Sequence, residues 1–395
     1  MTIVVVNAIS IREGGSLVVL RELLGGMAAY RPQWHWHVVV NNAVKSSLLD
    51  LPNVEYLRFP KVDQSGVRTR LWYETGLPRL LKGVSADVLF SMTNYLPMRR
   101  MPCHTLLLVQ HAGHFSPAFR QLTEERLGLL GRVAWRLKGS WVKSSVRRAD
   151  IVTVQTHALA HQIAHETGLS PDRFRVVPHG VGLANLQARP TASPAQGEKI
   201  RIGYIAKYGV QKNFNVLFDA IALLRERGVP LSLVLTLSET QQESKEVLQA
   251  AKDKGVADLI ENLGERPADE IDKVFGTLHA LVFPSICESF GFPMVEAMAH
   301  GVPLLVSDTD SNIEVAGAGA VVFPAHDAEL LANELERLSH DAEWFQLRAQ
   351  ASLQRARDFD WTRVAVETVS LVDELVGRRR LGGTAITAPF EGRCR

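Results

Sequence analysis

The sequence predicts an α/β protein built from two doubly wound parallel sheets, and three observations support this fold class. Short apolar runs recur along the chain, and most are nearly continuous in Val, Ile and Leu, as strands buried on both faces are. Stretches with helical spacing separate these runs. The length of 395 residues also suits two domains of about 100–200 residues each.

The expected strands form two series, with helical patterns such as 213–227 and 327–338 between or after them. The expected strands are 2–7, 36–41, 87–91, 105–110, 151–155 and 174–178 in the first series, and 200–205, 231–236, 259–263, 280–284, 303–307 and 320–323 in the second. Two successive βαβ series predict two doubly wound domains. Ligands of such proteins bind at the carboxyl ends of the strands, usually in the cleft between domains.

The domain boundary is expected within 182–199, a segment with two prolines, many small residues and no periodicity. A final pattern with helical apolar spacing begins at Trp361. The expected units are a first domain over 1–185, a linker over 186–199, a second domain over 200–360, a helix over 361–378 and a disordered tail over 379–395.

Composition and charge exclude several classes of protein. Lys and Arg number 44 against 42 Asp and Glu, and this near balance argues against a dedicated nucleic-acid binder. No run of 18 apolar residues is present to span a membrane, and the start, MTIVVVNAIS, is typical of a first strand and not of a signal peptide. Cys103, Cys287 and Cys394 form neither a disulfide framework nor a CxxC pair, so we expect a reduced, cytoplasmic chain.

The strongest motif is PSICESFGFPMVEAMAHGVP at 284–303, which begins where a strand ends and continues into a helix. Glu288 lies in the loop before this helix and Glu296 about one turn inside it. The backbone amides of Phe290, Gly291 and Phe292 would point outward from the helix N-terminus, where an anion or a sugar hydroxyl can accept them. The alternative is that both carboxylates solvate an ordinary helix start.

This motif resembles the E-x7-E signature of the retaining glycosyltransferases of family 4, which have the GT-B fold. The spacing from Glu288 to Glu296, the surrounding SFGFPMVEAMA and the following G-x-P carry the resemblance. The resemblance implies two Rossmann-like domains that face a cleft, with the C-terminal helix crossing back to the first domain. It also implies that the second domain holds a nucleotide diphosphate sugar and that the first brings the acceptor.

Two lysines after the strand at 200–205 are predicted to neutralise a diphosphate. Lys207 and Lys212 lie in GYIAKYGVQKN, between a strand and a helix. The family usually has G-R-L-x-x-x-K-x here, so Lys207 stands where the family has Arg and lacks its bidentate fork. The alternative is a pair of solvated loop lysines.

The loop after the first strand, within REGGSLVVLRELL at 12–24, is the next predicted donor contact. Gly14 and Gly15 permit close backbone approach, and the helix that follows directs its positive end at the cleft. The loop is not a GxGxxG motif, so a dinucleotide cofactor is not expected. The family places its Gly-rich loop against the donor phosphates here, and Arg266 is expected near the nucleotide base.

Histidines follow the strand at 105–110, in LLLVQHAGHF. In the family, a histidine at the position of His111 contacts the donor sugar beside the reacting carbon. His114 is the alternative, and either could be a polar loop residue. VVPHGVG resembles the family's I-P-N-G-V turn, with His179 where Asn is commoner. His179 is expected in the hinge, with donor contact as the alternative. Glu314 is expected to order its loop or approach the nucleotide, or to start a solvated helix.

Two patterns imitate metal sites and are interpreted as coincidences. Asp308-Thr309-Asp310 has the form of the DxD motif of the other glycosyltransferase fold, but it lies late in a GT-B-like half. His157, His161 and His165 share one helix face, as zinc ligands can, but no carboxylate or cysteine accompanies them in the sequence.

The segment 120–148 carries eight basic and two acidic residues together with two tryptophans. Its apolar face comprises Leu130, Ala134, Leu137 and Trp141, and its basic residues elsewhere include Arg132, Arg136, Lys143 and Arg147. Two interpretations remain: the helix covers the sheet, or it docks on anionic lipid headgroups or an anionic acceptor.

The expected function is therefore retaining transfer of a hexose, from GDP-mannose or a UDP-hexose, onto a saccharide or lipid-linked saccharide in bacterial polysaccharide or lipopolysaccharide synthesis. Lys207, Lys212 and the glycine loop would stabilise the leaving diphosphate without metal or cofactor. Glu296 would hold the ribose, and Glu288 would orient the sugar. The expected location is cytoplasmic, peripheral at the inner membrane face. A sugar-nucleotide epimerase or a non-catalytic sugar or sugar-nucleotide binding protein is the alternative.

Overall fold

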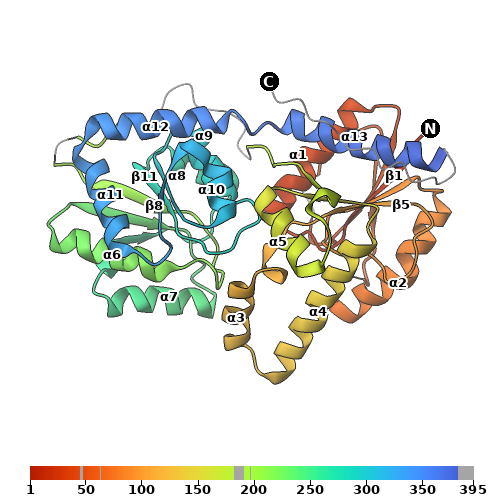
Figure 1. Ribbon diagram of the computed structural model, residues 1–395, viewed down its shortest axis with the longest axis horizontal. Helices are drawn as coiled ribbons and strands as arrows, with labels where there is room; N and C mark the ends of the chain where they lie inside the picture. The colour runs from red at the N-terminus through yellow and green to blue at the C-terminus, as the bar shows by residue number, and fades with distance from the viewer. Residues whose placement is uncertain (45–47, 63, 182–190, 196, 381–395) are drawn as a thin grey trace.

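The computed structural model describes residues 1–44, 48–62, 64–181, 191–195 and 197–380. Two parallel sheets lie side by side with helices on both faces of each (Figure 1). This arrangement confirms the predicted fold class. The predicted linker lies partly, and the predicted tail almost wholly, outside the described residues.

The first sheet has the order β3-β2-β1-β4-β5-β6-β7, so the strand order reverses between β1 and β4. Its strands are β1 (Ile3–Ala8), β2 (His35–Val40), β3 (Val54–Arg58), β4 (Val88–Ser91), β5 (His104–Leu108), β6 (Ile151–Val154) and β7 (Phe174–Val176). One face of the sheet packs on α1 (Gly15–Tyr30). The other face packs on α2 (Gly66–Gly83), α4 (Leu129–Arg148) and α5 (His157–Thr167). Helix α3 (Pro117–Arg126) precedes α4 in the chain. These elements form the N-terminal half.

Strand β3 is absent from the sequence prediction. It lies at the edge of the sheet, and each of its residues is half-buried or exposed. Continuous apolar runs mark strands buried on both faces, and a half-solvated edge strand lacks that signal.

The second sheet has the order β10-β9-β8-β11-β12-β13 and reverses between β8 and β11. Its strands are β8 (Ile200–Tyr204), β9 (Leu231–Leu235), β10 (Ile260–Asn262), β11 (Ala280–Phe283), β12 (Leu304–Ser307) and β13 (Ala320–Phe323). Its helices are α6 (Phe214–Glu226), α7 (Gln242–Asp253), α8 (Ala268–Phe275), α9 (Phe292–Ala299), α10 (Asp310–Ala316), α11 (Ala328–His340) and α12 (Ala342–Ala356). These elements form the C-terminal half, with one continuous core.

The last helix, α13 (Trp361–Arg380), crosses back and packs on α1 of the N-terminal half (Figure 1). A Cβ at Gly26 would lie 2.6 Å from the Cβ of Ala365, so glycine allows the two helices to approach closely. The helix extends two residues beyond the expected end at 378. No helix in the described part of the chain is long and apolar enough to cross a bilayer.

Candidate functional site

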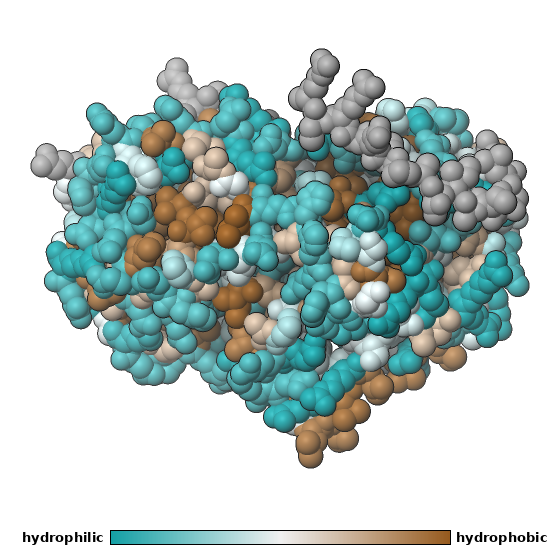
Figure 2. All heavy atoms as spheres, in the orientation of Figure 1, coloured by the Kyte–Doolittle hydropathy of each residue, from teal (hydrophilic) through white to brown (hydrophobic). Residues whose placement is uncertain are grey.

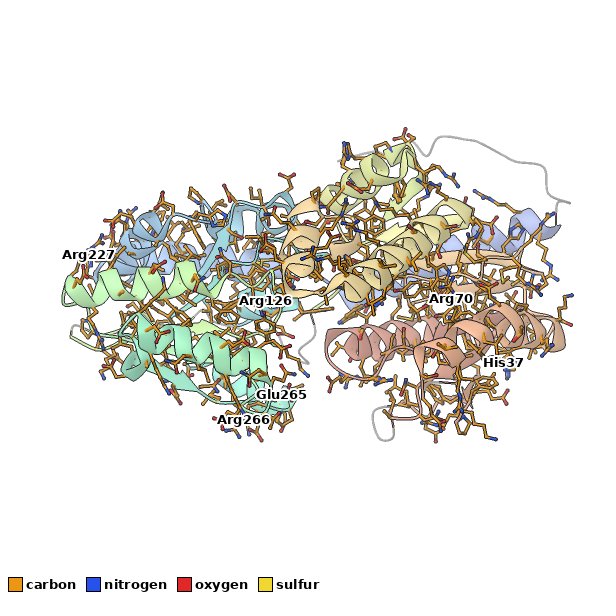
Figure 3. The ribbon with its side chains drawn as sticks, turned by 90° about the horizontal axis from the view of Figure 1, so that it is seen from below. His37, Arg70, Arg126, Arg227, Glu265 and Arg266 are labelled. Atoms are coloured by element: carbon orange, nitrogen blue, oxygen red, sulfur yellow. The ribbon has the colours of Figure 1, made fainter. Side chains whose placement is uncertain are left out.

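A cavity of about 970 Å³ lies between the two halves, at the carboxyl ends of strands from both sheets. Every residue predicted for the site lines this cavity: Gly14, Gly15, His111, Lys207, Lys212, Arg266, Glu288, Phe290, Gly291, Phe292 and Glu296. Figure 3 shows Arg266 and the adjacent Glu265 on the C-terminal half where it faces the N-terminal half. The fold therefore brings together residues that are up to 282 positions apart.

The Gly-rich loop and the start of α9 approach each other across this cavity. A Cβ at Gly15 would lie 2.9 Å from the ring of Phe292, so only glycine fits without displacing that ring. Gly14 has a φ of +69° and Gly291 a φ of +86°, backbone conformations that side chains disfavour. The N-termini of α1 and α9 consequently both face the cavity, where their free amides and dipoles favour an anion.

Lys212 and Glu288 form an ion pair in the cavity wall. Lys212 Nζ lies 2.7 Å from Glu288 Oε1, and the two side chains are only 14% and 15% exposed. The hydroxyl of Ser285 donates to the same oxygen at 2.6 Å. The pairing of a predicted diphosphate lysine with the predicted sugar-orienting carboxylate was not part of the sequence prediction.

Lys207 bridges the two halves. Its Nζ lies 3.0 Å from Oε1 of Glu13, in the Gly-rich loop, and 3.3 Å from Oε1 of Glu265 in the C-terminal half. Partial burial lowers the pKa of Lys207, but the two carboxylates outweigh it and the pKa is raised above its usual value. Sequence reasoning missed both acidic partners, although Glu13 lies directly before the predicted Gly14.

Glu296 is half-buried within α9 and lines the cavity. Burial, with a smaller contribution from the charge of Asp272, raises the pKa of Glu296 to about 7. The carboxyl group is therefore divided between its charged and neutral forms near neutral pH.

The two histidines after β5 have different environments. His111 is accessible from the cavity, where desolvation and, next, the charge of Lys138 lower its pKa. His114 is buried and stacks on Trp135 with ring centroids 4.3 Å apart, and burial lowers its pKa to about 3. His114 is thus a packing residue, and His111 is the histidine that a ligand in the cavity can contact.

Glu314 joins the two halves and does not line the cavity. Its Oε1 accepts the amide of His157 at 2.7 Å and its Oε2 the amide of Ala158 at 2.8 Å, so it caps the N-terminus of α5 from α10. His179 stacks on Phe292 with an interplanar angle of 4° and on Trp361 with one of 29°. His179 therefore packs where α13 leaves the C-terminal half, at the back of the cavity.

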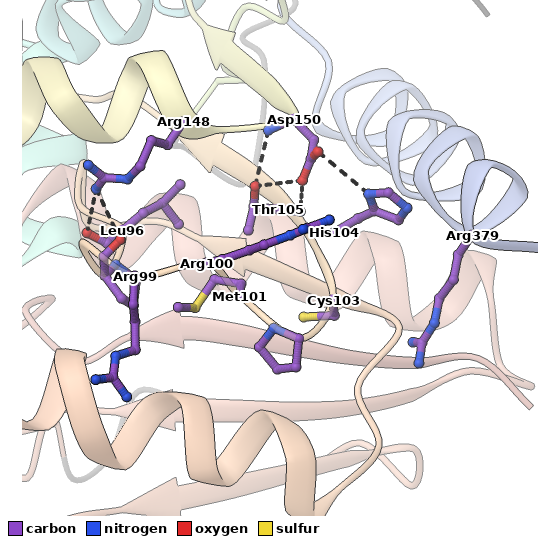
Figure 4. A pocket seen from close by; sticks show the side chains of 12 residues that line it. Leu96, Arg99, Arg100, Met101, Cys103, His104, Thr105, Arg148, Asp150 and Arg379 are labelled. Atoms are coloured by element: carbon purple, nitrogen blue, oxygen red, sulfur yellow. Dashed lines mark hydrogen bonds and ion pairs between the residues drawn. The ribbon is translucent and has the colours of Figure 1, made fainter. Parts of the chain in front are cut away.

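The two metal-like patterns do not meet in the main cavity. Asp308, Asp310, His161 and His165 line a neighbouring cavity of about 490 Å³. A third cavity, of about 540 Å³, contains no predicted site residue (Figure 4). Its wall includes Arg148 and Arg379, which donate to backbone carbonyls, and Asp150, which accepts from Thr105.

Comparison with known proteins agrees with this architecture. Residues 188–356 match the family described as Glycosyl transferases group 1. A segment of 236 residues is 29% identical to an MMP alpha-(1->4)-mannosyltransferase of Mycolicibacterium hassiacum, covering 58% of this chain and 55% of that protein. An O-antigen chain mannosyltransferase B of Escherichia coli is 27% identical over 168 residues, 42% of this chain and 44% of that protein. The chain thus spans about half the length of the curated relatives it matches.

The solved structures share the whole fold. The sucrose-phosphate synthase of Thermosynechococcus elongatus superposes with a TM-score of 0.74 over 95% of this chain and 100% of that one, at 16% identity. An Anabaena protein crystallised with UDP-glucose superposes with a TM-score of 0.67 over 95% of this chain and 100% of that one, at 15% identity. The likeness identifies the GT-B fold, as the sequence predicted.

Proposed function

We propose that this chain, whose residues 188–356 form a group 1 glycosyltransferase domain, transfers a hexose from a nucleotide diphosphate sugar to a saccharide acceptor with retention at the anomeric carbon. The observation that carries the proposal is the convergence of Lys207, Lys212, Glu288 and Glu296 on one cavity, faced by two helix N-termini. Cations and helix ends suit a diphosphate, and carboxylates suit the hydroxyls of a sugar and a ribose.

The chemistry follows from the charge that develops. When the bond between the anomeric carbon and the diphosphate oxygen breaks, negative charge grows on the diphosphate and needs fixed donors. Lys207, Lys212 and the amides around Gly14 and Gly15 supply them, and no metal or cofactor is required. Lys207 lies between two carboxylates, so the incoming diphosphate replaces Glu13 or Glu265 as its partner.

The remaining residues orient the donor. Glu288 and the amides after it bind the sugar hydroxyls, and Glu296 binds the ribose hydroxyls. His111 lies beside the reacting carbon, and Arg266 lies near the base. The lowered pKa of His111 keeps its imidazole neutral, so it can accept or donate a hydrogen bond without adding charge.

For the donor, we infer GDP-mannose or a UDP-hexose. The mannosyltransferases among the relatives support the first, and the Anabaena structure with UDP-glucose supports the second. For the acceptor, we infer a saccharide or lipid-linked saccharide of a bacterial surface polysaccharide, and the O-antigen chain mannosyltransferase among the relatives supports this inference.

A membrane-borne acceptor also accounts for the surface of α4. Leu129 and Leu130 are 80% and 88% exposed, and Val133 and Leu137 on the same helix are 56% and 60% exposed. Figure 2 shows a hydrophobic patch at the bottom of the molecule, where α3 and α4 meet in Figure 1. An exposed apolar patch flanked by arginines is typical of a surface that docks on anionic lipid.

The predicted apolar face of α4 is split in the structure. At its C-terminal end, Trp141 donates to the carbonyl of Leu96 at 2.9 Å, and Val142 and Val146, which are not part of the predicted face, are buried. Leu130 and Leu137, at the other end of that face, point to solvent. The C-terminal part of α4 thus covers the sheet, whereas its exposed N-terminal part, at the bottom of the molecule in Figure 1, is the part that we propose docks on lipid.

Vesicle flotation tests the docking surface. We expect the protein to float with vesicles that contain phosphatidylglycerol and not with pure phosphatidylcholine, and Leu129→Ser with Leu130→Ser to abolish flotation. Leu347→Ser, an exposed position on the C-terminal half, is the matched control. Equal flotation of the double variant and the control would remove α4 from the proposal.

Nucleotide release from a panel of GDP- and UDP-sugars, with and without saccharide acceptors, tests the enzyme. A transferase releases nucleotide faster with an acceptor and makes a product with the anomeric configuration of the donor. Conversion of the donor without any acceptor would indicate an epimerase, and binding without turnover a sugar-nucleotide binding protein. Inversion of configuration would contradict retention.

A further inference from the structure

A cluster of metal-ligating side chains lies on the outer part of the first sheet, unrelated to the cavity. His35 and His37 are alternate residues of β2, so both point to the same face of the sheet. Glu55 of β3 is the register partner of His37. Among the residues that the structure describes, these three form the one group of His, Cys, Asp or Glu that could hold a metal ion.

The three ligand atoms already converge. Nδ1 of His37 lies 2.9 Å from Oε2 of Glu55, and Nε2 of His35 lies 4.0 Å from the same oxygen. All the ligand atoms lie within 4.8 Å of one another. Ligands bound tetrahedrally to zinc at about 2.0–2.2 Å are about 3.3–3.6 Å apart. The separations of 2.9 and 4.0 Å within the cluster lie on either side of that spacing.

We propose that His35, His37 and Glu55 bind a divalent transition-metal ion, with Zn²⁺ as the matching ion. Two imidazoles and one carboxylate are a ligand set that zinc accepts, with water in the remaining position. The side chain of Glu55 is 55% exposed and that of His37 is 11% exposed, so the site is open to solvent on one side and held by protein on the other.

The site has a structural consequence. β3 is the edge strand of the sheet and lies against β2 alone. An ion coordinated by residues of both strands links β3 to β2. Because it binds the folded chain, it stabilises the folded state by mass action. His35 is the first residue of β2, whereas the cavity lies at the carboxyl ends of the strands; Figure 3 shows His37 far from Glu265 and Arg266. The proposal is therefore independent of the proposed glycosyl transfer.

The histidines of α5 make a useful contrast. His157, His161 and His165 are all exposed along one helix, and no third ligand atom approaches within reach of any two of them in the described structure. His161→Ala therefore serves as the control for nonspecific binding by surface histidines.

Calorimetric titration of the full chain with ZnCl₂ after EDTA treatment tests the proposal. We expect one equivalent to bind, and His37→Ala and Glu55→Gln each to weaken binding at least tenfold, while His161→Ala binds as the unaltered protein does. Zinc should raise the melting temperature of the unaltered protein by a few degrees and leave that of His37→Ala unchanged. Circular dichroism and melting in EDTA check that each variant is folded.

Three results would overturn the proposal: no stoichiometric binding by the unaltered protein, equal binding by His37→Ala and Glu55→Gln, or loss of binding in His161→Ala. If His37→Ala unfolds in EDTA, Glu55→Gln decides alone, since Glu55 is exposed. Neither the zinc titration nor the melting measurement depends on nucleotide-sugar turnover. If zinc does not bind, the proposed glycosyl transfer is therefore unaffected.

Discussion

Lys212 is expected to contribute both to the stability of the fold and to glycosyl transfer, and substitutions of Lys212 and Glu288 distinguish the two contributions. Its ammonium lies 2.7 Å from Glu288 Oε1 and the pair is about 85% shielded from solvent. Lys212→Met leaves a shielded carboxylate whose remaining side-chain partner is Ser285. Loss of one partner of a fully buried pair costs about 3–5 kcal/mol. The hydrogen bond from the Ser285 hydroxyl and the partial exposure of Glu288 reduce this cost. We therefore expect Lys212→Met to lower the free energy of unfolding by about 2–3 kcal/mol.

The double variant Lys212→Met with Glu288→Gln provides the decisive comparison. It removes both charges, so we expect most of the lost stability to return. Turnover should fall about 10²–10³-fold in Lys212→Met, because a fixed donor to the leaving diphosphate is gone, and it should not recover in the double variant. Glu288→Gln alone should also lose transfer while remaining folded.

The assay pairs thermal or urea unfolding with nucleotide release at saturating donor. Unfolding midpoints give the coupling between Lys212 and Glu288, and turnover gives the catalytic effect. If Lys212→Met turns over at the full rate, the assignment of Lys212 to the diphosphate is wrong. If the stability of Lys212→Met equals that of the unaltered protein, the charge of Lys212 does not stabilise the carboxylate of Glu288 in the folded state.

The further predictions concern Glu296 and Gly15, which line the cavity, and Glu314, which joins the two halves. Because the pKa of Glu296 is raised to about 7, its charged form grows as the pH rises through 7, so the donor KM should fall between pH 6 and 8 and the profile should flatten in Glu296→Gln. The same raised pKa favours the folded state at acid pH, so Glu296 should lower stability as the pH rises from about 4.5 to 7, and a variant with an unchanged slope would contradict this. Gly15→Ala places a Cβ 2.9 Å from the Phe292 ring and should raise the donor KM, whereas Gly83→Ala, which meets nothing within 4 Å, should not; equal kinetics for the two would refute the close approach. Glu314→Ala removes a helix cap that crosses the two halves and should cost about 1 kcal/mol in unfolding, with Glu314→Gln less affected; calorimetric melting distinguishes this from no effect.

The predicted site residues of the cavity could be found from the sequence because their motifs are local. Glu288 and Glu296 lie on one loop and helix, and each predicted donor contact directly follows a strand. The carboxyl ends of parallel strands meet at one edge of a sheet, so residues in these loops converge whatever their separation along the chain. The same reasoning left out β3, whose half-solvated edge position gives no continuous apolar run.

The partners of those residues were not predictable, since they depend on how the two halves meet. Glu13 and Glu265 reach Lys207 from different halves, and Glu314 caps a helix 157 positions earlier in the chain. No local pattern distinguishes such acidic residues from solvated ones. The apolar face of α4 was likewise undivided in the sequence, because only the sheet edge decides which turns are covered.

Short stretches of sequence predict the parallel α/β architecture, the final helix and the predicted site residues, because strand burial, helix signals and the E-x7-E spacing are local features. The folded arrangement alone shows which charges neutralise one another, that His111 and not His114 faces the cavity, and that His35, His37 and Glu55 converge. Strand register and the approach of the two halves determine the distances of a few ångströms between paired charges and between metal-ligating atoms. Those distances are properties of the folded chain, and no short stretch of sequence records them.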